Sequence, residues 1–125
     1  MPRAQTSKVI AIIDDDESMR DSMRDLIESA GLVARRFGSA EEFLGSDLHR
    51  RTACVIAGIR MPKMSGLELQ ARLKGEECDI PIIFITAHGD ARMRIRAMRE
   101  GAVEFLVKPF DHQLLVKTVR AALDM

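Results

Sequence analysis

Hydrophobic and polar positions alternate along this chain in blocks of two kinds. The first kind is a short apolar run rich in β-branched residues, and such runs lie at 8–13, 32–37, 53–57, 80–86 and 102–107. Three of these runs are almost continuously apolar, which is typical of parallel strands covered on both faces. The pattern therefore predicts five parallel strands.

The segments between these runs have the three- and four-residue spacing of amphipathic helices. In residues 17–30, Met19, Met23 and Ile27 recur on one side, and Gly31 follows as a stop. Further helices are predicted at about 40–48, 66–74, 90–100 and 111–123, with Gly75 and Gly101 as stops for the second and third.

Two of these helices are expected to begin with a capping box. Ser39 is followed by Glu42, and Ser65 by Glu68, so that each pair can satisfy the other's backbone amide. Asp111 is the predicted N-cap of the last helix.

The alternation of strand and helix predicts five βα units. Right-handed crossovers between parallel strands then give an α/β, doubly wound five-stranded sheet with helices on both faces. We expect a flexible tail over 1–7 and one domain over 8–123, because 125 residues suffice for a single buried core.

Composition narrows the functional classes. The 19 basic and 19 acidic residues cancel, so no global field favours nucleic acid or a membrane. The absence of Trp and Tyr argues against a base-stacking surface. Cys54 lies in an apolar run and is predicted to be a buried, reduced thiol. No apolar run reaches membrane-spanning length, and we expect a cytoplasmic protein.

Six residues lie at the ends of the predicted strands, at the edge where ligands bind in doubly wound sheets. These residues are Asp14, Asp15, Gly58, Thr86, Ala87 and Lys108. A run of acids alone is usually a solvated face, and a lone strand-end Thr or Lys is usually structural. Their coincidence at four strand ends instead favours a hard cation held by oxygens beside an oxyanion.

Four motifs carry a family resemblance: IIDDDESMR (12–20), IRMPKMSGLEL (59–69), IIFITAHGD (82–90) and EGAVEFLVKPF (100–110). With them the chain resembles the CheY-like, flavodoxin-like receiver domain of two-component response regulators, in particular the FixJ-like branch. The resemblance implies a signalling domain rather than an enzyme. It also implies phosphoryl transfer from a histidine kinase to an aspartate with Mg²⁺, and in this branch a DNA-binding domain that follows the receiver.

The resemblance also implies roles for single residues. The metal ligands are Asp14, Asp15 and the backbone carbonyl of Arg60, and the phosphate and switch residues are Thr86, Ala87, Lys108 and Phe105. Pro109 is expected after a cis peptide bond. We further expect Lys108 to pair with Asp14 or Asp15.

The family's acceptor aspartate should stand at position 58, where this chain has glycine. Phosphorylation at that position is then impossible, and Mg²⁺ is expected to bind weakly or not at all. A natural degenerate receiver and a single substitution in an ordinary one both remain open, although the otherwise complete set of residues favours the second. Two functions also remain: a receiver that cannot be phosphorylated at this position, or a pseudo-receiver acting as a phosphate-independent interaction or dimerisation module.

A candidate output surface lies on the predicted helix 90–100. Its arginine stripe comprises Arg92, Arg96 and Arg99, with Glu104 and Asp111 as nearby acids. A solvated face explains the stripe equally well. The alternative is a homodimer through the 90–123 face, as in similar receivers.

Two further expectations concern side chains near this surface. Ala91, Ile95 and Met98 share one side of the helix and are predicted to face the core. His88 is predicted to be a plain surface histidine near the site.

Overall fold

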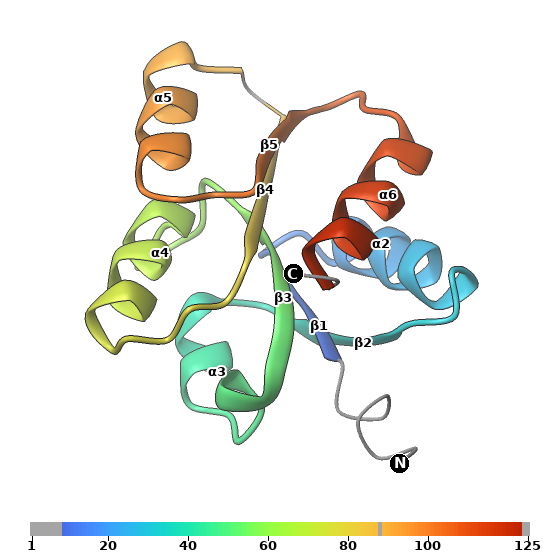
Figure 1. Ribbon diagram of the computed structural model, residues 1–125, viewed down its shortest axis with the longest axis horizontal. Coiled ribbons are helices and arrows are strands. Elements are labelled where there is room, and N and C mark those ends of the chain that lie inside the picture. The colour runs from blue at the N-terminus through green and yellow to red at the C-terminus, as the bar shows by residue number, and fades with distance from the viewer. Residues whose placement is uncertain (1–8, 88, 124–125) are drawn as a thin grey trace.

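The computed structural model describes residues 9–87 and 89–123 and contains one five-stranded parallel sheet between two layers of helices (Figure 1). The strands are β1 Val9–Ile13, β2 Val33–Phe37, β3 Thr52–Gly58, β4 Ile82–Thr86 and β5 Glu104–Val107, in the order β2-β1-β3-β4-β5. The predicted strands and the predicted fold class are therefore confirmed. The expected tail over 1–7 and His88 lie outside the described residues.

The helices also follow the predicted order. They are α2 Glu17–Ser29, α3 Ala40–Leu44, α4 Gly66–Gly75, α5 Ala91–Arg99 and α6 His112–Leu123, with a 3₁₀ turn at His49–Arg51. The helix predicted over 40–48 is shorter than expected and ends at Leu44. The hydroxyl of Ser46 donates to the Phe43 carbonyl over 2.7 Å, which supports the termination of the helix at this point.

The two predicted capping boxes differ. At Ser65 the box is complete, because Ser65 Oγ accepts from the Glu68 amide and Glu68 Oε1 accepts from the Ser65 amide over 2.8 Å. At Ser39 only the forward bond forms, since the Glu42 carboxylate instead accepts from the amide of Gly38 over 2.7 Å. That prediction was wrong by one residue.

Helix ends were predicted from glycines with mixed success. Gly31 and Gly101 have φ of 83° and 105° and terminate α2 and α5 as expected. Gly75 remains inside α4, and Glu77 takes the left-handed position with φ of 56°. The Cys78 amide then donates to the Leu73 carbonyl over 2.9 Å, which closes the helix without a glycine.

The sheet separates two apolar cores. Alternate strand residues such as Ile13, Ala57 and Phe84 pack with α3, α4 and α5 on one face. Their neighbours, such as Ile12 and Ile56, pack with α2 and α6 on the other face. None of the helices in the described ranges has the length and apolar character needed to cross a bilayer.

Cys54 lies in the second of these cores and is fully buried, as predicted. Burial raises the pKa of its thiol to about 12, so the side chain remains a protonated, apolar thiol at neutral pH.

The orientation of α5 differs from the prediction. Ile95 is 56% exposed and Met98 is 37% exposed, and Ala91 also faces outward. Ala97 is fully buried instead, because its carbonyl accepts a hydrogen bond from Gln70 Nε2 over 3.1 Å and so brings α4 against it. A residue two positions away points about 200° around the helix, and Ile95 is therefore turned to the surface.

Gly66 permits the close approach of α4 to the end of β3. A Cβ at this position would lie 2.3 Å from the Gly58 carbonyl oxygen and 3.0 Å from Phe84 Cε1. We expect Gly66→Ala to destabilise the fold by about 1–3 kcal/mol, because backbone must move to accommodate the methyl group.

Urea denaturation measures this change, with Gly75→Ala as the matched control. A Cβ at Gly75 has nothing within 4 Å, so that substitution should stabilise the last helical turn slightly. Equal stability of the two variants would contradict the proposed steric constraint.

Candidate functional site

The carboxyl ends of β1, β3, β4 and β5 surround a cavity of about 240 Å³. Its lining includes the strand-end residues singled out from the sequence, namely Asp14, Asp15, Gly58, Arg60, Thr86, Ala87 and Lys108. Asp16, Met19, Ile59 and Ile85 complete the wall. Residues from four distant segments thus meet at one edge of the sheet, as expected for this topology.

The register of the sheet explains why these residues meet. Ile13 pairs with Ala57, so the residues that follow them, Asp14 just after β1 and Gly58 at the end of β3, lie side by side. Gly58 in turn pairs with Ile85 on β4. At the far side, the Lys108 amide donates to the Thr86 carbonyl over 2.9 Å and holds the end of β5 against β4. The bond between Lys108 and Pro109 is cis, as predicted.

The acids after β1 have different structural roles. Asp16 is the N-cap of α2, because its Oδ1 accepts from the amides of Ser18 and Met19 over 2.9 and 3.3 Å. The sequence analysis treated the acidic run as one group and missed this role. An Asp directly before the first helical turn was the signal that could have revealed it.

Asp14 is held on two sides. Its Oδ1 accepts from the Asp16 amide over 2.9 Å, and its backbone carbonyl accepts from the Arg20 guanidinium over 2.8 Å. Arg20 is a second contributor; it closes the motif IIDDDESMR (12–20), but nothing in that motif by itself predicts this contact.

The Asp14 carboxyl leans toward Gly58. An ideal Cβ on Gly58 would lie 2.8 Å from Asp14 Oδ2 and 3.2 Å from its Cγ. Burial raises the pKa of Asp14 above its ordinary value of 3.8, and the charges of Asp15 and Asp16 add to this rise. The hydrogen bond from the Asp16 amide acts in the opposite direction. The acidic side of the cavity is therefore crowded with like charge.

The basic side of the cavity is less constrained. Lys108 is exposed, and within 9–87 and 89–123 it forms no ion pair with Asp14 or Asp15. The predicted pairing is therefore wrong. Asp14 Oδ1 is engaged by a backbone amide, and an exposed ammonium gains little from pairing because water screens the attraction.

The oxygen donors of this edge fit a hard cation in type but are few. Asp14, Asp15 and Arg60, whose carboxylates and backbone carbonyl are the predicted ligands, line the cavity, and the third acid, Asp16, caps α2. The described residues contain no group of three or more His, Cys, Asp or Glu arranged to hold a metal. Mg²⁺ bound here would keep most of its ligands as water, which is common for this ion.

Phe105 lies behind the cavity rather than in its wall. Only 4% of the residue is exposed, and its ring centroid is 6.5 Å from that of Phe84 on the neighbouring strand. Its side chain belongs to the core beneath α4 and α5.

The predicted output residues remain on the surface. Arg92, Arg96 and Arg99 are exposed and form no ion pair in the described part of the chain. Both nearby acids have partners within the chain. Glu104 lies 3.9 Å from Arg94 and accepts from the Phe105 amide, and Asp111 caps α6 through the amide of Gln113.

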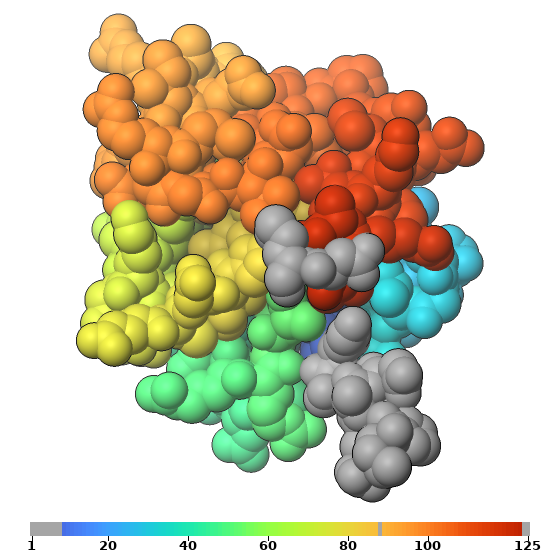
Figure 2. All heavy atoms as spheres, viewed as in Figure 1, coloured from blue at the N-terminus to red at the C-terminus, as the bar shows by residue number. Residues whose placement is uncertain are grey.

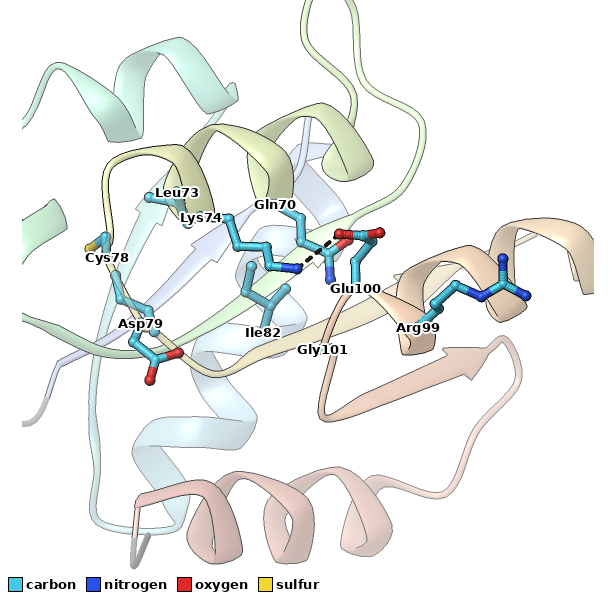
Figure 3. A pocket seen from close by; sticks show the side chains of 10 residues that line it. Gln70, Leu73, Lys74, Cys78, Asp79, Ile82, Arg99, Glu100 and Gly101 are labelled. Carbon is cyan, nitrogen blue, oxygen red and sulfur yellow. Dashed lines mark hydrogen bonds and ion pairs between the residues drawn. The ribbon is translucent and has the colours of Figure 1, made fainter.

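A second cavity of about 270 Å³ lies at the opposite end of the sheet, between α4 and α5 (Figure 3). The Lys74 ammonium and the Glu100 carboxylate form an ion pair of 2.9 Å across it, whereas Arg99 extends away from the other labelled side chains. None of the strand-end acids, Thr86 or Lys108 lines this cavity. The strand-end residues predicted from the sequence therefore line the smaller of these two cavities.

Comparison with known proteins agrees with the geometry. Residues 10–120 match the family model described as response regulator receiver domain. Nodulation protein W of Bradyrhizobium diazoefficiens is 46% identical over 119 residues, which cover 95% of this chain and 52% of that protein. The transcriptional regulatory protein FixJ of the same organism is 40% identical over 114 residues, covering 91% of this chain and 56% of FixJ.

Solved structures give the same result. The crystal structure of FixJ-N superposes with a TM-score of 0.84 at 34% identity, covering 94% of each chain. The structure of the response regulator StyR has a TM-score of 0.84 at 42% identity, covering 94% of this chain and 59% of StyR. The present chain spans about half the length of the curated relatives it matches.

A match over most of the described residues, the flavodoxin-like strand order and the convergence of four strand ends all point to one assignment. This chain belongs to the family of response regulator receiver domains of two-component systems.

Proposed function

We propose that this receiver domain has lost phosphoryl transfer at the family's usual position, because Gly58 stands where the acceptor aspartate belongs. One observation carries the proposal. Asp15, Thr86 and Lys108 line a single cavity with Gly58, and this position is the one in that wall without a side chain. The site therefore retains its surrounding groups and lacks a nucleophile at its centre.

The remaining residues keep recognisable tasks in this proposal. Asp14, Asp15 and the Arg60 carbonyl would hold Mg²⁺, which neutralises charge on phosphoryl oxygens when bound. Without a carboxylate at 58, one ligand and one charge are missing, and we expect affinity in the millimolar range or weaker. Lys108 would pair with a phosphoryl oxygen, and the Thr86 hydroxyl would donate to another.

A path for the signal follows from the sheet. Thr86 at the cavity pairs with Val107 on β5, and Phe84 pairs with Phe105. Movement of Thr86 toward a phosphoryl group would thus shift its paired residues on β5, the edge strand that carries Phe105. In the present structure the Phe105 ring is buried.

The output is proposed by analogy with the relatives. FixJ is described as a transcriptional regulatory protein, and its matched part is about half of its length. We propose that this domain receives its signal from a cognate histidine kinase and controls transcription through a DNA-binding domain outside the present chain.

The surface of α5, β5 and α6 is the proposed homodimer face, with a second copy of this chain as the partner. In Figure 2 these elements form a continuous surface coloured orange to red. Ile95, Met98 and Val107 are exposed on α5 and β5, and the arginine stripe flanks the first two. An apolar patch beside a stripe of arginines is the composition expected of such an interface.

The alternative is a pseudo-receiver that acts as a phosphate-independent interaction or dimerisation module. The lack of a side chain at Gly58 is the observation that favours it. The two functions differ in how the chain responds when an acceptor is restored.

The proposal is tested by Gly58→Asp treated with acetyl phosphate or beryllofluoride in the presence of Mg²⁺. We expect uptake of the phosphoryl group at position 58 and a shift from monomer to dimer, followed by mass spectrometry and sedimentation. Gly58→Asn is the matched control, since it fills the same space without a nucleophilic carboxylate. An unmodified and unresponsive Gly58→Asp would support the phosphate-independent module instead.

Restoring the acid should also lower stability when Mg²⁺ is absent. Asp14 Oδ2 lies 2.8 Å from the Cβ position of residue 58, so a third carboxylate would crowd Asp14 and Asp15. We expect charge repulsion in Gly58→Asp to lower the free energy of unfolding by about 1–2 kcal/mol. Removal of a glycine from the strand should offset this loss by up to about 1 kcal/mol.

Gly58→Ala isolates the backbone and steric part of this effect. In thermal or urea unfolding without Mg²⁺, the free energy of unfolding of Gly58→Asp should be lower than that of Gly58→Ala. Added Mg²⁺ should raise the stability of the Asp variant more than that of the Ala variant. A metal-free Gly58→Asp more stable than Gly58→Ala would rule out the repulsion argument.

The dimer face is tested by charge reversal. In phosphorylated Gly58→Asp, the further change Arg96→Glu should weaken dimerisation about 3- to 10-fold, and raising salt toward about 1 M should weaken the unreversed dimer. Arg35→Glu on β2 is the control, because Arg35 is equally exposed at the other edge of the sheet. Equal effects of the two reversals, or no effect of salt, would place the arginine stripe outside the interface.

A further inference from the structure

We propose that Asp14 is itself a phosphoryl acceptor: its carboxylate takes the phosphoryl group of small acyl phosphates in place of the side chain missing at position 58. This inference rests on the proposed function, because it uses the same cavity. It differs from that proposal by assigning a modification site to a residue otherwise expected only to assist metal binding.

The position of one oxygen is the first argument. Asp14 Oδ2 lies 2.8 Å from the ideal Cβ of residue 58, whereas Oδ1 lies 3.7 Å away. Ordinary bond lengths place the carboxylate oxygens of an aspartate about 2.4 Å from its own Cβ. The distance from Asp14 Oδ2 to the Cβ position of residue 58 is therefore close to the distance between that Cβ and the carboxylate oxygens of an aspartate at position 58.

The orientation of the carboxylate is the second argument. The Asp16 amide holds Oδ1, and the Arg20 guanidinium holds the Asp14 backbone carbonyl. These two contacts leave Oδ2 as the oxygen turned toward residue 58. A nucleophile fixed in this way loses little freedom when it reacts, and such positioning is a large part of phosphoryl-transfer catalysis.

The surrounding charges are the third argument. Lys108 lines the same cavity and has no acidic partner among 9–87 and 89–123, so its ammonium can approach the oxygens of an incoming phosphoryl group. Asp15 and Asp16 oppose an anion, whereas Arg60, which also lines the cavity, carries a positive charge. Gly58 adds no carboxylate to this repulsion and leaves room beside Oδ2.

The proposed step is a simple displacement. A lone pair of Asp14 Oδ2 attacks the phosphorus of acetyl phosphate and forms a new P–O bond. The bond from phosphorus to the bridging oxygen breaks, and acetate leaves with that electron pair. The product is an acyl phosphate on Asp14, and nothing is oxidised or reduced.

The unaltered chain is treated with acetyl phosphate and Mg²⁺ and then with borohydride, which reduces an aspartyl phosphate to homoserine and so marks the acceptor. Peptide mass spectrometry should find homoserine at position 14, and the intact mass before reduction should show one added phosphoryl group. Asp14→Asn should lose this modification. Homoserine at another position, or none, would overturn the inference.

One further variant separates this result from the proposed function. Gly58→Asp should carry its label at position 58. Labelled Gly58→Asp beside an unlabelled starting chain would overturn the role of Asp14 and leave the proposed function standing. Failure of both chains to take up label would reject the proposed function as well.

Discussion

The parallel hydrogen-bonded register of β1, β3, β4 and β5 is the constraint on which the site depends. Each strand delivers its carboxyl end to the same edge, and pairs such as Ile13 with Ala57 and Gly58 with Ile85 set how far each end projects. The apolar strand residues that hold this register are buried on both faces. The functional side chains therefore need no contact with one another to stay in place, because the sheet positions them independently.

The backbone ladder accordingly runs through Gly58, which has no side chain, and Gly66 lies against the Gly58 carbonyl. Asp14 leans into the volume beside Gly58, where burial and the neighbouring acids raise its pKa. A carboxylate in this environment is protonated more readily than an isolated aspartate.

The surface of α5, the proposed output surface, is less firmly held than the strand ends. Only a narrow side of α5 contacts the core, at Met93 and Ala97, so the helix leaves Ile95, Met98 and the arginine stripe in solvent. A helix with so few core contacts gives up little packing energy when it moves.

The amino-acid sequence by itself determined the five strands, their parallel direction and the edge at which the strand-end residues meet. These features follow from local periodicity and from the general handedness of βα crossovers, which need no knowledge of individual contacts. Only the tertiary structure decided three other features. These are the rotation of α5 about its axis, the left-handed residue after α4 being Glu77 rather than Gly75, and the lack of an ion pair between Lys108 and the acids. Each depends on which of several groups takes a given space or hydrogen-bonding partner. The Asp16 amide takes the Asp14 carboxylate, and the Gln70 side chain takes the Ala97 carbonyl. Contacts of this kind do not recur at a regular spacing along the chain, and therefore no sequence pattern predicts them.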